Sequence, residues 1–442
     1  MEFPRSSNDI LSLEELEDVW PILQGEERLE ALYAPSRPVA ENFFLQLSSE
    51  DQADILTNLP EGEKRSWIRL LPPDDAADVL QIVNKEQHPS LLQYLDEPTR
   101  KEVTALLAYA EDDAGGLMNP RYARLRPDMP LDEAISYLKR QTRAQIENIY
   151  YIYVLDEGQH LLGVVSYRDL FSADPQKKIR DIMRTHIVKA DEAMDQEALG
   201  QLFKRYKFLA VPVVDSENRL KGVVTVDDIV DVMTEEATED IQKLGAVSPL
   251  EMPYMKTSIF DLVKKRAGWL SVLFLGEMLT ASAMSRYALE IEKAVVLALF
   301  LPLIISSGGN SGSQASTLVI RAMAVGEITL RDWWRVAKRE IFSGLALGGV
   351  LGVIGFIRIF VWQYFFESYG EHYTLIAITL FASLIGVVLI GTIAGSMLPF
   401  ILSRLKLDPA SASAPFVATL VDVGGLIIYF SIAALLLQGS LL

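Results

Sequence analysis

The residue that most clearly needs a chemical explanation is an aspartate inside an apolar stretch. Asp422 is the only charged residue after Asp408, and it lies in a run long enough to cross a bilayer. A carboxylate at membrane depth costs roughly 2.5–3.5 kcal/mol on insertion scales. Gly424 and Gly425 follow it, so another backbone can approach closely at this point. We therefore expect Asp422 to have a function that requires a negative charge in the membrane.

A second apolar run carries an unusual density of small polar residues. Positions 306–314 read SSGGNSGSQ, within a run that extends over residues 294–321. Such residues suit close helix contacts or a water-lined cavity better than contact with lipid. We predict that this run and the run around Asp422 face each other across a pore. Helix packing alone is the alternative for the small polar residues.

Three interpretations of Asp422 follow from the residues around it. A ring of carboxylates from two subunits, with asparagine and backbone carbonyls behind it, could hold a hydrated divalent cation loosely, and this fits best. An ion pair with Arg358 and a proton relay with Glu277 are the alternatives. The sequence contains no Gly-x-x-x-x-Gly-Lys phosphate loop, so we expect flow down an electrochemical gradient.

The charge of the chain is unevenly distributed. The formal net charge is −18, yet residues from Gly268 onward contain ten basic and ten acidic side chains, so the excess belongs to residues 1–267. An acidic soluble half favours cations as partners and argues against nucleic acid. The chain has no cysteine and only four dispersed histidines, which argues against thiolate and zinc-type sites.

Five apolar segments reach the length of ~20 residues that a membrane-spanning helix needs. They cover residues 268–288, 294–321, 341–366, 374–402 and 410–438. Because basic residues gather at one side of these segments, the positive-inside rule predicts a cytoplasmic N-terminal half and an external C-terminus. The basic residues on the inner side are Lys264, Lys265, Arg266, Arg321, Arg331, Arg335, Lys338, Arg339, Arg404 and Lys406, against Arg286 and Lys293 on the outer side.

Near the start of the soluble half, apolar residues recur every twelve positions over residues 40–110. Proline and acidic residues recur beside these positions, as they do in the first turns of helices. The pattern predicts an all-α superhelical domain of short stacked helices. Acidic residues of one such turn are either helix caps or cation ligands: Asp74, Asp75 and Asp78.

A longer internal repeat follows, with an offset of 59 residues. The sequence GVVSYRDL at position 163 returns as GVVTVDDI at position 222, and each copy reads strand, turn, strand and capped helix. Amphipathic helices are expected at 131–140 and 196–206. The repeat resembles a tandem pair of α+β CBS modules, and the resemblance implies adenine-nucleotide contacts at Thr225 and Asp228. A purely structural role for these two residues is the alternative.

Residues 231–267 connect the repeat to the apolar segments. They combine an acidic helix-forming stretch at 234–244 with an amphipathic run at 259–266, whose basic end suits a cytoplasmic membrane surface.

Taken together, these parts resemble the MgtE family of magnesium channels over nearly the whole chain. The resemblance implies a multi-domain protein: an N-terminal acidic helical domain (1–115), two CBS modules (116–178 and 179–234), a connecting plug helix (235–267) and a five-helix pore domain (268–442). It further implies a homodimer in the cell membrane, with Mg²⁺ at Asp422, Asn310 and Gly309 in the pore and ATP as a candidate ligand of the CBS modules. Cytosolic Mg²⁺ would bind acidic residues and close the pore through the plug. Those residues are Asp74, Asp75, Asp78, Asp228, Asp231, Glu236, Glu239, Asp240 and Asp408.

Two other functions remain open from the sequence. One is a CBS-regulated transporter of another substrate, such as Co²⁺ or Mn²⁺, since oxygen ligands suit several divalent ions. The other is a membrane-bound nucleotide or metal sensor that transports nothing. An enzyme is not expected.

Overall fold

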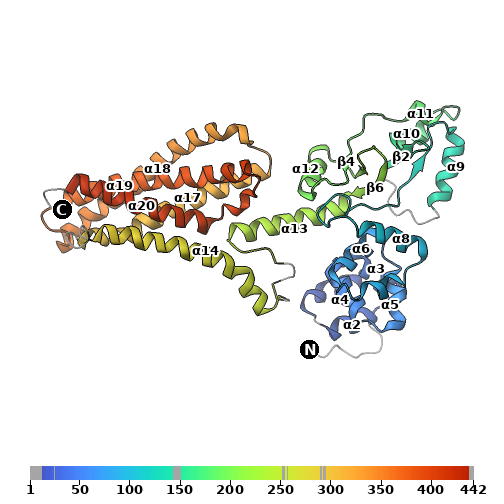
Figure 1. Cartoon of the computed structure of the whole chain (residues 1–442), viewed down its shortest axis with the longest axis horizontal. Coiled ribbons are helices and arrows are strands. Elements are labelled where there is room, and N and C mark those ends of the chain that lie inside the picture. The colour runs from blue at the N-terminus through green and yellow to red at the C-terminus, as the bar shows by residue number, and fades with distance from the viewer. Residues whose placement is uncertain are drawn as a thin grey trace. The chain divides into compact units, whose positions relative to one another are not determined.

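A computed structural model of the 442-residue chain describes residues 12–23, 25–142, 151–250, 254–255, 257–288, 291 and 295–437. Two compact units are present, Met1–Glu236 and Ala237–Leu442 (Figure 1).

The first unit opens with short stacked helices, which confirms the all-α prediction. Apolar residues of the twelve-residue repeat lie at helix ends. Leu59 and Val83 are the C-cap residues of their helices, and both side chains are buried in the core. The helix α4 packs on α6, and α6 on α8. In chain order the elements are α1 (Leu13–Val19), η1 (Trp20–Ile22), α2 (Glu26–Tyr33), α3 (Arg37–Gln46), α4 (Ser49–Asn58), α5 (Glu61–Ile68), α6 (Pro73–Ile82), α7 (His88–Leu92) and α8 (Glu97–Leu106).

Two similar α+β modules follow, each with a three-stranded sheet. Tyr151 and Ala210, which begin the middle strands, are 59 residues apart, as the repeat predicts. In each sheet the first strand pairs parallel with the second, and the second pairs antiparallel with the third. The elements are β1 (Arg124–Leu125), α9 (Leu131–Thr142), β2 (Tyr151–Leu155), β3 (Leu161–Ser166), α10 (Tyr167–Ser172) and α11 (Ile179–Ile182), then β4 (Ala190–Asp191), α12 (Gln196–Tyr206), β5 (Ala210–Val214), β6 (Leu220–Thr225) and α13 (Val226–Leu244).

The turns of the two modules are joined directly to each other. The Leu161 amide donates to the Asn218 carbonyl at 2.9 Å, and the Leu220 amide donates to the Gln159 carbonyl at 3.0 Å. These two reciprocal hydrogen bonds connect the modules to each other.

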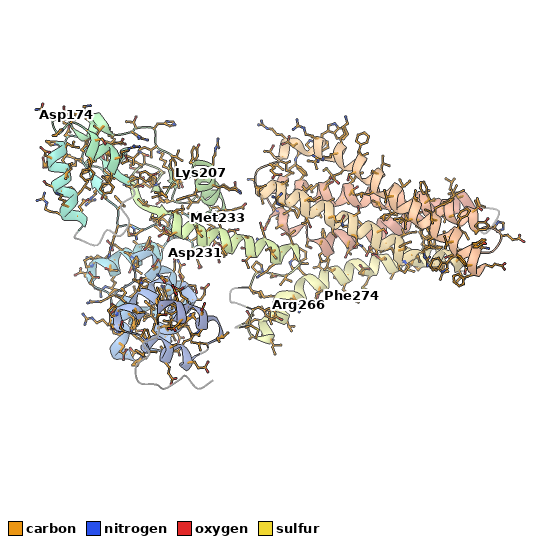
Figure 2. All side chains as sticks on the ribbon, turned by 180° about the vertical axis from the view of Figure 1, so that it is seen from behind. Asp174, Lys207, Asp231, Met233, Arg266 and Phe274 are labelled. Atoms are coloured by element: carbon orange, nitrogen blue, oxygen red, sulfur yellow. The ribbon has the colours of Figure 1, made fainter. Side chains whose placement is uncertain are left out.

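Both helices of the connecting region are longer than the sequence suggested. The helix α13 begins at Val226, directly after β6, and continues to Leu244, so it crosses the expected boundary at residue 234 without a break. The amphipathic run 259–266 and the first apolar segment form one helix, α14 (Ile259–Arg286). Figure 2 labels Arg266 and Phe274 on this helix. Gly268 is the only weak helix former near the join, and one glycine costs only ~1 kcal/mol relative to alanine.

Within the described residues, five helices are long and apolar enough to span a membrane. The helix α19 is central: it packs on α18, α17 and α20, whereas α14 packs on α20 (Figure 1). Lys293, one of the two basic residues predicted on the outer side of the membrane, lies outside the described residues. Besides α14, the elements are α16 (Val295–Ala298), α17 (Leu301–Ala324), η2 (Leu330–Asp332), α18 (Trp333–Phe366), α19 (Tyr373–Arg404), η3 (Pro409–Ser411) and α20 (Ala414–Leu437).

Candidate metal sites

The carboxylate of Asp422 faces a backbone that has no side chain in front of it. A Cβ built on Gly309 of α17 would lie 3.9 Å from Asp422 Oδ1 and 3.3 Å from the Cβ of Ala418. Asp422 is half-buried on α20, one turn after Ala418. The structure therefore brings together two of the three predicted pore residues, Asp422 and Gly309, from the two helices expected to face each other.

The glycines within residues 306–314 have different surroundings. Gly308 and Gly312 turn toward α19, where a Cβ on Gly312 would meet the Gly391 carbonyl oxygen at 2.8 Å. One on Gly391 would collide with the Gly308 carbonyl in turn. Helix packing thus explains Gly308 and Gly312, as the alternative proposed, whereas the missing side chain of Gly309 lets the α17 backbone approach Asp422.

The third predicted pore residue, Asn310, is exposed next to Gly309. Its Nδ2 donates to Ser306 Oγ at 3.3 Å, one turn earlier on α17. Arg358, the alternative partner of Asp422, instead approaches the Tyr369 hydroxyl at 3.4 Å and lies over the Trp362 ring, 4.8 Å from its centroid. Among the described ion pairs, none joins Arg358 to Asp422.

In the first unit, three predicted sensing residues converge. Each of Asp74, Asp75 and Asp228 offers a carboxylate oxygen, and these oxygens lie within 4.8 Å of one another. Asp74 is buried in the first turn of α6, where its Oδ1 accepts from Asn119 Nδ2 at 3.1 Å. Asp228 lies in the first turn of α13 and accepts from the Thr225 hydroxyl at 2.8 Å. We call these three residues the first acidic group.

Burial and mutual repulsion make the charges of this group unfavourable. Burial raises the pKa of Asp74 well above its ordinary value, and the charges of Asp75 and Asp228 raise it further. Burial likewise raises the pKa of Asp228 to about 6. Carboxylates that are this close and this poorly solvated form a site that a cation would stabilise.

Further acidic residues extend the first group. Burial, followed by the charges of Asp74 and Asp228, raises the pKa of Asp78. Glu111 and Glu235 also act on Asp78, and burial raises the pKa of each. These two glutamates are absent from the sequence prediction. The run Glu111-Asp112-Asp113 was a detectable signal for the first of them.

These pKa shifts predict how the first acidic group responds to pH without divalent ions. Between the unfolded pKa of ~3.9 and the folded pKa of Asp228, about 6, the folded chain binds more protons than the unfolded chain. The free energy of unfolding therefore falls as pH rises through this window, by about 3 kcal/mol for Asp228 alone. Hydrogen exchange of β6 and α13 at pH 5 and pH 7.5 in EDTA, corrected for intrinsic rates, should show weaker protection at pH 7.5. Equal protection would contradict the prediction, and Asp228→Asn should reduce the difference, since the other acidic residues of this group still contribute.

In the second unit, the other predicted sensing residues meet around a lysine. Lys243 Nζ lies 2.6 Å from Asp408 Oδ2 and also pairs with Glu239. Burial raises the pKa of Asp240, and the charge of Asp408 raises it further. Leu244 packs beside this point with Ile320 and Ala410. We call Glu239, Asp240 and Asp408 the second acidic group, in which Lys243 supplies a built-in cation.

The remaining predicted residues lie along α13, between the two groups. Asp231 is one turn after Asp228, and its pKa is raised by burial and then by Asp227 (Figure 2). Glu236 accepts from Gln196 Nε2 at 2.7 Å. The helix α13 thus carries Asp228 of the first group and Glu239 of the second.

A cavity of about 90 Å³ lies beside the first acidic group. Tyr153 is buried in its wall, and the Tyr153 hydroxyl has no hydrogen-bond partner among the described residues. Thr225 and Asp228, the predicted nucleotide residues, also line it, together with Arg121, Tyr122, Tyr151, Asp74 and Asp75. The cavity therefore combines aromatic, cationic and acidic groups.

The fold defines a multi-pass membrane protein with paired CBS modules and clustered acidic residues. Family models match in the same order: the MgtE intracellular N domain at 11–112, the CBS domain at 114–175 and 179–235, and the MgtE divalent cation transporter domain at 301–432. The magnesium transporter MgtE of Thermus thermophilus is 41% identical over 424 residues, covering 95% of this chain and 92% of that protein. The chain belongs to the MgtE family.

Other similarities agree with this order of domains. The magnesium transporter MgtE of Bacillus subtilis is 34% identical, over 88% of this chain and 84% of that protein. Half of this chain (50%) is similar to 90% of the cytosolic domain of the Mg²⁺ channel MgtE crystallised with ATP, at 41% identity and a TM-score of 0.46. Inosine-5′-monophosphate dehydrogenase of Aquifex aeolicus is 26% identical, but over only 26% of that enzyme. The family is one of transporters, not of enzymes.

Proposed function

We propose that this protein carries Mg²⁺ passively into the cell and that cytosolic Mg²⁺ closes its pore. The observation that carries the proposal is the close approach of Gly309 on α17 to Ala418 and Asp422 on α20, in a chain whose relatives are magnesium transporters. Mg²⁺ gives up its waters reluctantly, so a single carboxylate and nearby backbone suit a hydrated ion better than a stripped one. A divalent ion gains about 4.6 kcal/mol per 100 mV of membrane potential, so no further energy source is needed.

The pore is formed, in this proposal, by two copies of the chain. Asn310 is exposed on α17 at membrane depth in the single chain. An amide in contact with lipid would be unfavourable, whereas a pore shared with a second copy would provide water and polar partners. Two copies would also place two Asp422 carboxylates around one ion. In this proposal the N-terminal half lies in the cytoplasm, which the basic residues at the ends of the spans support.

The gate in this proposal is α13. Mg²⁺ at the first acidic group would restrain one end of this helix, and Mg²⁺ at the second acidic group would restrain the other. At low Mg²⁺ the neighbouring carboxylates repel, by roughly 4 kcal/mol for two charges 4 Å apart at an effective dielectric near 20. Several such pairs suffice for the ~5.5 kcal/mol that moves an equilibrium from 1:99 to 99:1.

ATP is the nucleotide proposed for the cavity beside the first acidic group. Tyr151 and Tyr153 could contact the base, Thr225 the ribose, and Arg121 the phosphates. The unpartnered hydroxyl of Tyr153 supports a ligand with polar groups at this place.

Uptake into liposomes tests the proposal. Full-length protein in vesicles that contain a Mg²⁺ indicator should admit Mg²⁺ when a potential, negative inside, is imposed, without ATP. Raised Mg²⁺ on the side of the N-terminal half should stop the uptake. Uptake of Co²⁺ or Mn²⁺ with exclusion of Mg²⁺ would favour the other cation transporters, and no flux of any cation would favour a sensor.

A further inference from the structure

A second acidic residue lies beside Asp422 and has no part in the pore described above. Glu277 of α14 is close enough for its carboxyl group to hydrogen-bond with that of Asp422. It is midway along the apolar segment 268–288, and its side chain is exposed in the single chain. A carboxylate in contact with lipid at this depth is strongly unfavourable. Glu277 therefore needs an environment of water or cations.

The packing of α14 on α20 fixes where Glu277 lies. Gly276 is so close to Thr419 that a Cβ would meet the Thr419 methyl at 2.5 Å. Further along, the rings of Tyr287 and Phe430 stack with centroids 4.8 Å apart. Because contacts on both sides of Glu277 hold the two helices together, Glu277 and Asp422 are held on one seam.

A buried hydroxyl on the same seam also lacks a partner. Thr280 lies one turn after Glu277 on α14, and its side chain is only 8% exposed. Its Oγ1 has no hydrogen-bond partner among the described residues. Since α20 is the helix on which α14 packs, Thr280 is buried on the side that carries Glu277. A buried polar group without a partner indicates a ligand or water at this place.

We propose that Glu277 is a second acidic residue of the pore's cation site, where it binds a water of the hydrated Mg²⁺ beside Asp422 and favours divalent over monovalent ions. The inference rests on the proposed Mg²⁺ pathway. Two adjacent carboxylates attract a divalent ion more strongly than a monovalent one, because each charge acts on twice the ionic charge. In a pore formed by two copies, the site would contain two such pairs.

Neutralising Glu277 should weaken the binding of Mg²⁺ in the pore and reduce the selectivity of the pore for divalent ions. In liposomes that contain the full chain, Glu277→Gln should raise the half-saturating Mg²⁺ concentration about tenfold, or about 1.4 kcal/mol, and lower the preference for Mg²⁺ over Na⁺. Glu277→Asp, which keeps the charge, should remain close to wild type. The matched control is Glu371→Gln, which removes one exposed carboxylate from the loop between α18 and α19. If Glu277→Gln has wild-type half-saturation and selectivity while Asp422→Asn abolishes the flux, this inference fails and the proposed pore stands.

A second variant tests the charge even if glutamine impairs folding. The chain contains no cysteine, so Glu277→Cys provides a single thiol for methanethiosulfonate reagents. A negatively charged reagent should restore Mg²⁺ selectivity, a positively charged one should block the flux, and MgCl₂ should slow both reactions. Equal effects of the two reagents, or a reaction rate that MgCl₂ leaves unchanged, would overturn the inference.

Discussion

Asp422→Asn is expected to reduce Mg²⁺ uptake by about 100-fold or more. A hydrogen bond to a charged group contributes ~1.5–3 kcal/mol, and two copies of the chain would lose two charged acceptors for the waters of the ion. Asparagine has nearly the same shape as aspartate, so the packing of α20 on α17 at Gly309 should be preserved. Radioactive or fluorescent uptake into liposomes, at matched protein density, measures the effect.

Two further variants separate the ion site from a structural charge. Arg358→Gln should conduct like the wild type, because Arg358 contacts Tyr369 and Trp362. Asp132→Asn is a matched control, since it changes the same residue type at an exposed position on α9, outside the spans. Uptake by Asp422→Asn at the wild-type rate would show that the pore is elsewhere.

The order of the domains could be predicted from the sequence, because each domain has its own characteristic sequence pattern. The spacing of Leu59 and Val83, the 59-residue repeat and the five apolar runs are local patterns, and the structure confirms all three. Residues 306–314 were harder to interpret, because glycine serves both close packing and an open site. Gly308 and Gly309 are neighbours in sequence, yet Gly308 packs against Val387 of α19 and Val421 of α20, whereas Gly309 approaches Ala418 and Asp422 of α20.

Contacts between distant segments were beyond the sequence. The nine predicted sensing residues share only their acidic character, and nothing in their order indicates that most of them gather into two groups. The role of Lys243 could not be foreseen either, because its partner Asp408 is 165 positions away. The pairing of Glu277 with Asp422 likewise depends on the packing of α14 against α20.

Asp74→Asn should make the gate much less sensitive to Mg²⁺. The change removes one charge from the first acidic group, and Asn can still accept the hydrogen bond from Asn119. Repulsion at low Mg²⁺ then decreases, so α13 is more restrained without Mg²⁺, and added Mg²⁺ has less repulsion to cancel. We expect the Mg²⁺ concentration for half-maximal protection of residues 245–267 from trypsin to rise about tenfold, which corresponds to ~1.4 kcal/mol. Cleavage of the wild type at the same rate with and without Mg²⁺ would refute the gate itself.

Lys243→Met should shift the same response in the opposite direction. The ammonium group of Lys243 pairs with the carboxylates of Asp408 and Glu239. An incoming Mg²⁺ must therefore compete with this side chain for the two carboxylates. Methionine keeps the length of the side chain and much of its apolar contact but removes the charge. The second acidic group then gains repulsion and loses its competitor, and half-maximal protection should occur at a Mg²⁺ concentration several-fold lower. If both variants shift the response in the same direction, a general loss of stability explains them better than cation binding does, because only charge predicts opposite signs.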